Sequence, residues 1–228
     1  MQKFELCHII CIFVYSLPYF VKNSLIHSLY LFCKAITDRI LALGLLLLSL
    51  PALLCIVVIL FAWNKQKVFF KQVRIGQHSR LFWVYKFRTM NEAKDAQGNL
   101  LSDALRITRI GLFLRKTSLD ELPQLWNILR GDMSFVGPRP LLPEYLPLYN
   151  KQQASRHSVP QGLTGWAQIH GRNALDWQAR LELDAYYAHN ASLRLDIYIL
   201  LKTAYLMITK HDGDILAEKF NGNAKKVL

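Results

Sequence analysis

The chain has 228 residues, 28 lysines and arginines against 16 aspartates and glutamates, and a formal net charge of +12 at pH 7. That length suffices for one domain with a hydrophobic core plus a membrane segment. The cysteines lack zinc-ligand spacing and no aromatic RNA-binding stretch is present, so we expect neither a zinc site nor a nucleic-acid partner. We interpret Cys7, Cys11, Cys33 and Cys55 as small hydrophobes in a reducing compartment.

Residues 6–21 form a short apolar stretch that Pro18 interrupts. Glu5 and the lack of a small-residue cleavage site argue against a cleaved signal peptide. We interpret the stretch as an interfacial helix within an N-terminal apolar extension, residues 1–33. An upstream translation-start artefact is the alternative that the sequence leaves open.

Residues 40–63 carry no charge and are long enough to cross a hydrocarbon core of about 30 Å. Pro51 lies at the centre, and a proline bends or breaks a helix because it removes a donor and clashes with the preceding turn. Ser49 can help satisfy the freed backbone. We predict a re-entrant membrane helix over residues 34–64, broken at Ser49 and Pro51, and an ordinary kinked spanning helix is the alternative.

Basic residues flank both ends of this segment, so neither end is marked as the more cytoplasmic. No carboxylate lies between Asp38 and Glu92, and seven basic residues follow the apolar segment within that interval: Lys65, Lys67, Lys71, Arg74, Arg80, Lys86 and Arg88. We expect this run to lie on anionic lipid at the cytoplasmic face of the membrane. A solvated basic face is the simpler alternative.

The sequence pattern of residues 65–228 predicts a cytoplasmic domain with an α+β fold that is mostly α. Residues 66–89 are rich in Val, Phe and Tyr and carry a turn at 75–78, which predicts a β-hairpin. Apolar spacing predicts four helices: residues 104–115, 118–129, 174–190 and 193–210. The last is either an amphipathic helix on the bilayer or a buried core helix.

The adjacent acids Asp120 and Glu121 lie between Arg115 and Arg139. Carboxylates can bind a hard cation or act as a nucleophile, and arginine pairs with phosphate oxygens. The segment therefore suggests chemistry on a phosphate or diphosphate. The alternative is purely structural, since Ser118 and Glu121 also have the spacing of a helix-capping box.

These motifs resemble those of the bacterial sugar transferases, the monotopic polyprenyl-phosphate phosphoglycosyl transferases. The resemblance covers about residues 34–222 and rests on three strings, Ser118–Gln124 (SLDELPQ), Gly131–Pro140 (GDMSFVGPRP) and Gly162–Gln168 (GLTGWAQ), after the tract Tyr85–Met90 (YKFRTM). One departure is that the family breaks its membrane helix at Ser-Pro, whereas Leu50 separates Ser49 from Pro51 here.

The resemblance implies transfer of a sugar 1-phosphate from a UDP-sugar to undecaprenyl phosphate at the cytoplasmic face of the bacterial inner membrane, with release of UMP. It implies that Asp120 is the nucleophile that forms a covalent phosphosugar intermediate, that Glu121 is its acid/base partner, and that Asp120 holds Mg²⁺. The expected substrate-binding residues are Lys86, Arg88, Arg115, Arg139, Arg172 and Asn173.

Within the family, residues 141–150, 171–178 and 218–222 look closest to the transferases that use UDP-N,N'-diacetylbacillosamine. Another UDP-N-acetyl sugar is the alternative donor, and a membrane-anchored scaffold without activity is the alternative function. The expected partners are the UDP-sugar donor, the undecaprenyl phosphate acceptor and membrane lipid. The sequence leaves open whether the chain also forms a homo-oligomer.

Overall fold

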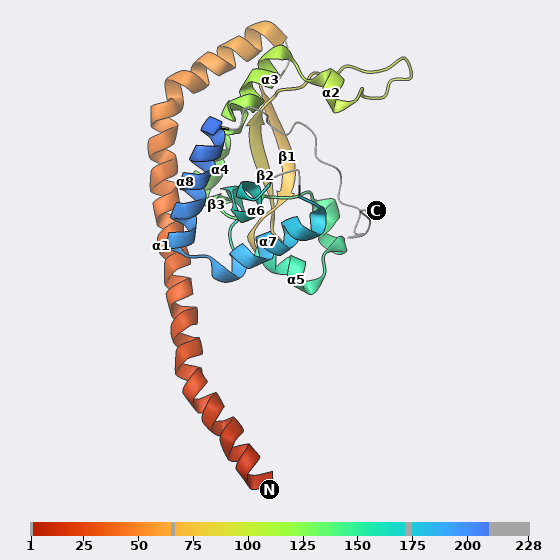
Figure 1. The fold of residues 1–228 in the computed structure, drawn as a ribbon. Helices are drawn as coiled ribbons and strands as arrows, with labels where there is room; N and C mark the ends of the chain where they lie inside the picture. Colours follow the sequence, from red (N-terminus) through yellow and green to blue (C-terminus); the bar gives the residue numbers. More distant parts are fainter. Residues whose placement is uncertain (1, 65–66, 172–174, 210–228) are drawn as a thin grey trace.

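The computed structural model describes residues 2–64, 67–171 and 175–209. Among these residues the chain is mostly helical with two two-stranded sheets, so the predicted α+β class is confirmed at that level. The helices are α1 (Gln2–Asn64), α2 (Asp103–Arg106), α3 (Arg109–Lys116), α4 (Gln124–Arg130), α5 (Lys151–Ala154), α6 (Trp166–Ile169), α7 (Trp177–Asn190) and α8 (Leu193–Thr209). Figure 1 shows α1 along one side of the folded remainder.

Helix α1 continues past Ser49 and Pro51, and the Ser49 hydroxyl donates to the Leu46 carbonyl at 3.4 Å. Figure 1 shows the orange C-terminal part of α1 turning away from the axis of the preceding part. Within the described residues, one stretch, His27–Ala62, is long and apolar enough to cross a membrane by length and composition. Whether the chain re-enters or spans stays a prediction.

The predicted hairpin is present as β1 (Phe69–Ile75) and β2 (Leu81–Phe87), an antiparallel pair in register from Phe69 opposite Phe87 to Ile75 opposite Leu81. The turn closes where the Gly76 amide donates to the Arg80 carbonyl at 2.7 Å. Val84 and Phe87 of β2 are both buried, and because they point to opposite faces of the strand they belong to two different hydrophobic clusters.

The helix predicted over residues 104–115 is instead two helices, α2 and α3. Ile107 forms an isolated bridge with Met90, which takes the backbone out of the helix. Thr108 then caps α3, since its hydroxyl accepts from the Gly111 amide at 2.9 Å. The predicted helix over 118–129 is likewise a 3₁₀ turn, η2 (Leu119–Glu121), followed by α4.

The two C-terminal helices match their predictions closely. Helix α8 packs beside α1, as Figure 1 shows, where Tyr30 and Leu31 of α1 join a buried cluster that contains Ile199. Other α8 side chains are exposed, Leu201 and Ile208 among them. Helix α8 therefore has one buried stripe and one exposed apolar stripe, and contact of the exposed stripe with a bilayer stays a prediction.

Both parts of α1 on either side of Pro51 pack on the folded domain. Before it, Ala42 is buried with Val84 and Ile128. After it, the buried residues Ile56 and Leu60 lie in a cluster with Phe87 and Leu114: a second contact between α1 and the same domain.

A buried polar network also ties α1 to the domain. The Lys34 ammonium forms an ion pair with Asp196 of α8 and lies 3.7 Å from Asp38. Asp38 in turn accepts from the Ser134 hydroxyl at 2.6 Å. Ser134 begins β3 (Ser134–Val136), which pairs in parallel with β4 (Gly162–Thr164).

Candidate active site

The turn η2 presents Asp120 and Glu121 directly after α3. Ser118 precedes it with φ +56° and makes no side-chain cap, so the predicted capping box is wrong. The reason is that the Ser118 amide donates to the Arg115 carbonyl at 3.1 Å, leaving the Glu121 side chain to pair elsewhere. Leu119 and Leu122, on either side of the acids, pack against the α1 cluster of Ile56 and Leu60, which fixes the turn.

Glu121 forms ion pairs with two cations from distant parts of the chain. Its Oε1 lies 2.5 Å from the Lys86 ammonium of β2 and 3.3 Å from the Arg139 guanidinium. Burial raises the pKa of Glu121, but Lys86 and Arg139 outweigh burial and bring it to about 2. Glu121 is therefore ionised at neutral pH.

Asp120 has a different environment from its neighbour. Its side chain is 9% exposed, and within the described residues no hydrogen bond to its carboxylate is present. Burial raises the pKa of Asp120, Lys86 opposes that rise, the adjacent Glu121 charge adds to it, and Arg115 and Arg139 oppose it. Three cations therefore act on the Asp120 carboxylate, but among the described residues it forms no ion pair with any of them.

The side chain of Arg139 is exposed, but its backbone is held by hydrogen bonding to a buried residue. The fully buried Arg156 donates to the Arg139 carbonyl at 2.6 Å and to the Asp184 carboxylate of α7 at 2.7 Å. Gly137 lies against β4, where an added Cβ would come within 2.2 Å of the Pro160 carbonyl. The close approach to Pro160 explains why position 137 is a glycine. The hydrogen bond from Arg156 holds the backbone of Arg139 in place.

Two other predicted arginines have different places. Arg115 donates to the Thr89 hydroxyl at 2.9 Å and is close enough to affect Asp120 electrostatically, so it belongs to the site. Arg88 instead forms an ion pair with Glu92 at 2.7 Å, in the loop after β2. The predicted contacts Arg172 and Asn173 lie outside the described residues.

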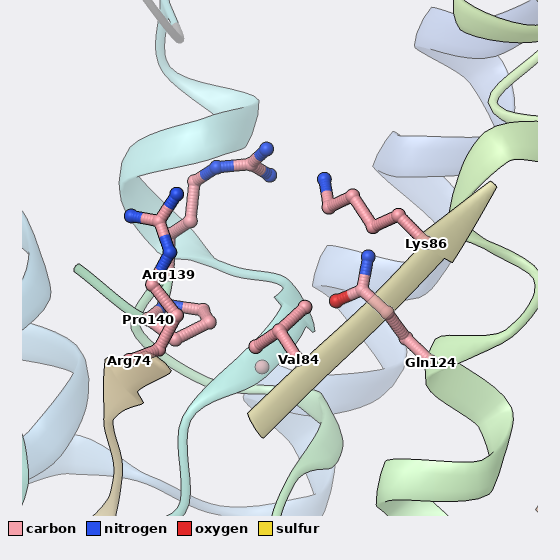
Figure 2. Close-up of a pocket in the computed structure, with 7 residues that line it drawn as sticks. Arg74, Val84, Lys86, Gln124, Arg139 and Pro140 are labelled. Atoms are coloured by element: carbon pink, nitrogen blue, oxygen red, sulfur yellow. The ribbon is translucent and has the colours of Figure 1, made fainter. Parts of the chain in front are cut away.

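Figure 2 shows a pocket that sequence reasoning had only partly identified. It is lined by Arg74, Val84, Lys86, Gln124, Arg139, Pro140 and Gly162. Two of the residues that line it, Lys86 and Arg139, form the ion pairs with Glu121. Arg74 and Gln124 were not predicted as site residues. Arg74 was one of seven similar cations in a basic run, and its position beside Arg139 and Gly162 at the pocket distinguishes it only in the folded structure.

No group of three or more His, Cys, Asp or Glu side chains comes together to hold a metal in the part of the chain that the structure describes. A Mg²⁺ ion does not require one, because it often binds through one or two carboxylates plus substrate phosphates and water. Asp120, a carboxylate with no competing hydrogen bond from the described residues, fits that mode.

The assembled groups can act on a phosphate ester. A buried carboxylate can attack phosphorus, while cations beside it can stabilise the charge that gathers on the phosphoryl oxygens. The adjacent ionised carboxylate can accept a proton.

Comparison with known proteins places these motifs in a known group. Residues 29–210 match the family model described as bacterial sugar transferase. The uncharacterized sugar transferase EpsL of Bacillus subtilis is 52% identical over 160 residues, which are 68% of this chain and 79% of that protein.

Two relatives with more specific names are longer. The UDP-galactose-lipid carrier transferase of Erwinia amylovora is 37% identical over 85% of this chain and 44% of its own length. The UDP-glucose:undecaprenyl-phosphate glucose-1-phosphate transferase of Xanthomonas campestris pv. campestris is 40% identical over 77% of this chain and 38% of its own length. The chain thus spans less than half of the length of these two relatives.

Proposed function

This chain belongs to the bacterial sugar transferase family, and we propose that it transfers a sugar 1-phosphate from a UDP-sugar to undecaprenyl phosphate, releasing UMP. The observation that carries the proposal is the arrangement at η2: a buried carboxylate, Asp120, beside Lys86, Arg115 and Arg139. The names of the longer relatives, which specify UDP-sugar donors and lipid acceptors, support the substrate classes.

In the proposed first step, a carboxylate oxygen of Asp120 attacks the phosphorus that bears the sugar. The bond from that phosphorus to the bridging oxygen breaks, and UMP leaves with the bonding electrons. In the second step, a phosphate oxygen of undecaprenyl phosphate attacks the same phosphorus and displaces Asp120. The products are a lipid diphosphate sugar and the regenerated carboxylate.

The charges of the site suit each of these steps. Lys86 and Arg139 can exchange Glu121 for phosphoryl oxygens when substrate binds, because phosphate offers stronger acceptors. Glu121, ionised and released from one of these pairs, can accept the proton that a singly protonated lipid phosphate must lose. Mg²⁺ at Asp120 would supply further neutralisation of the diphosphate.

The position of the site next to α1 supports a lipid acceptor. Leu119 and Leu122 flank the acids and pack on the part of α1 that follows Pro51. Contact of both parts of α1 with one domain supports the re-entrant path, since a straight spanning helix would carry its far end away from that domain. We propose that α1 and the exposed apolar stripe of α8 dock on the cytoplasmic leaflet of the inner membrane.

For the donor we propose UDP-N,N'-diacetylbacillosamine, on the resemblance of three segments given above. Another UDP-N-acetyl sugar in the same reaction is the alternative. The test is UMP release from a panel of UDP-sugars, with Mg²⁺ and undecaprenyl phosphate in nanodiscs.

Asp120→Asn tests the nucleophile in the same assay. We expect loss of UMP release of about 10³-fold or more, with unchanged thermal unfolding, because the amide keeps the shape of the side chain but is not a nucleophile. Asp95→Asn, a change in the exposed loop after β2, is the control. Retained turnover in Asp120→Asn would refute the nucleophile, and inactivity of the wild-type protein across the panel would favour the scaffold alternative.

A further inference from the structure

The pocket of Figure 2 holds more positive charge than the nearby carboxylates balance. Figure 2 shows the Arg139 guanidinium and the Lys86 ammonium pointing toward one another from opposite sides, with Arg74 beside Arg139. Both Lys86 and Arg139 share a single acceptor, Glu121 Oε1.

Arg74 adds a third cation to this pocket. Among the described residues, its guanidinium donates a hydrogen bond to the neutral Gln72 side chain at 2.7 Å. Burial, and then repulsion from Arg139, lower the pKa of Arg74 to about 10. Arg74 and Arg139 repel one another, and a bound anion would relieve that repulsion.

Gln124 supplies an independent observation. Its side chain is 3% exposed, and its Nε2 has no hydrogen-bond partner in the part of the chain that the structure describes. Figure 2 shows this amide beside Lys86, at the pocket that both residues line. A buried donor without a partner costs about 1–3 kcal/mol, so the pocket offers a hydrogen bond that a ligand acceptor would complete.

We propose that Arg74 and Gln124, together with Arg139, form a subsite for a phosphate monoester next to Asp120. The inference rests on the proposed function and assigns roles to two further residues. In the first step the subsite would hold the phosphate of departing UMP, and in the second step the phosphate of the lipid acceptor. One subsite can serve both, since the acceptor must attack the phosphorus from the side opposite the Asp120 bond, which is the side that UMP left.

The test measures binding without turnover, so that it stays separate from the transferase assay. The full chain carrying Asp120→Asn is placed in nanodiscs and titrated with UMP in one arm and with a short-chain polyprenyl phosphate in the other. Arg74→Gln and Gln124→Met are added singly. The second of these keeps the length of the side chain and removes only the amide.

Each change should weaken binding by about tenfold or more, as expected for loss of a hydrogen bond to a charged group. Loss in both arms supports one shared subsite, and loss in a single arm identifies that phosphate as the occupant. Arg80→Gln, on the exposed hairpin turn, and Gln152→Leu, on the exposed side of α5, are matched controls and should leave both titrations unchanged.

The proposal is overturned if neither Arg74→Gln nor Gln124→Met changes the affinity of folded protein for either phosphate. It is also overturned if Arg80→Gln weakens binding equally, because the effect would then come from overall charge. Inactivity of the wild-type protein in the transferase assay would refute the proposed reaction but leave the binding result intact.

Discussion

At the scale of single residues, Asp120 and Glu121 show how neighbours acquire different chemistry. Glu121 is paired with Lys86 and Arg139, and its pKa falls to about 2. Asp120 has no such ion pair among the described residues, and burial raises its pKa. The sequence predicts both acids as site residues, but the division between them depends on which cations the fold brings to each.

His157 provides a prediction about pH. It is buried, and burial together with the charge of Arg156 lowers its pKa from 6.5 to about 4, although the Gly76 backbone opposes the change. Between those values the unfolded chain binds a proton that the folded chain does not. Stability should therefore fall as pH drops from 6.5 toward 4, by up to about 3 kcal/mol from this residue.

His157→Phe should remove that part of the pH dependence, because phenylalanine keeps a ring next to Tyr149 and does not titrate. The measurement is chemical unfolding of detergent-solubilised protein at a series of pH values from 7 to 4. His189→Gln, which alters an exposed histidine, should retain the wild-type slope. An unchanged slope in His157→Phe would show that His157 does not stay neutral in the folded protein.

Arg74 and Gln124 mark the limit of sequence reasoning at this scale. The residue types that carry phosphate chemistry stand out when they cluster in the sequence, as Asp120, Glu121 and Arg139 do. Arg74 reaches the pocket through the register of β1 against β2, and Gln124 through the first turn of α4. The pocket forms only where these two residues meet Arg139, Pro140 and Gly162, and no local pattern encodes that contact between distant segments.

At the scale of elements, the short helices depart most from the predictions. Apolar spacing alone favours one helix over 104–115, but the Ile107 bridge to Met90 and the Thr108 cap divide it. The hairpin and α7 and α8 were predictable because their patterns are long and regular. Local helical preference is weak, and tertiary contacts override it in segments of one or two turns.

Gly111 in α3 gives a prediction at this scale. An added Cβ would lie 2.0 Å from the Thr89 carbonyl, so α3 can approach the end of β2 only with glycine there. Gly111→Ala should cost about 3 kcal/mol of stability through overpacking. It should also lower transferase activity, because Arg115 of α3 donates to the Thr89 hydroxyl beside the site.

The matched control for this change is Gly44→Ala in α1. A Cβ at that position meets nothing within 4 Å, and alanine is a better helix former than glycine, so stability should stay equal or rise slightly. Thermal unfolding in detergent measures both variants. Equal stability of Gly111→Ala and wild type would show that α3 can move away from Thr89 without loss.

At the scale of the whole molecule, the path of α1 is the main question. The sequence predicts an apolar segment with a central proline, and it favours re-entry with spanning as the alternative. It does not show that α1 packs along the domain, because that packing includes ion pairs such as Lys34 with Asp196, which lie 162 positions apart.

Cysteine labelling tests the topology. In a variant without the four native cysteines, single cysteines at Thr37 and at Lys67 should both react with a membrane-impermeant maleimide only after the cells are permeabilised. The reason is that both flanks of a re-entrant helix lie on the cytoplasmic side. A cysteine at Arg80, in the hairpin turn, marks the cytoplasmic side. Labelling of either flank in intact cells would contradict re-entry.

The packing of Leu119 and Leu122 against α1 has a consequence for how the acceptor is found. In the proposed reaction, with the acids held against α1, a lipid phosphate would reach them by lateral diffusion within one leaflet. The encounter is then a search in two dimensions, and its rate follows the mole fraction of the lipid in the bilayer. Diluting the whole reaction mixture with buffer lowers the concentration of the soluble nucleotide sugar and would slow its capture. The mole fraction of the lipid in the bilayer stays the same, so capture of the lipid would be unchanged.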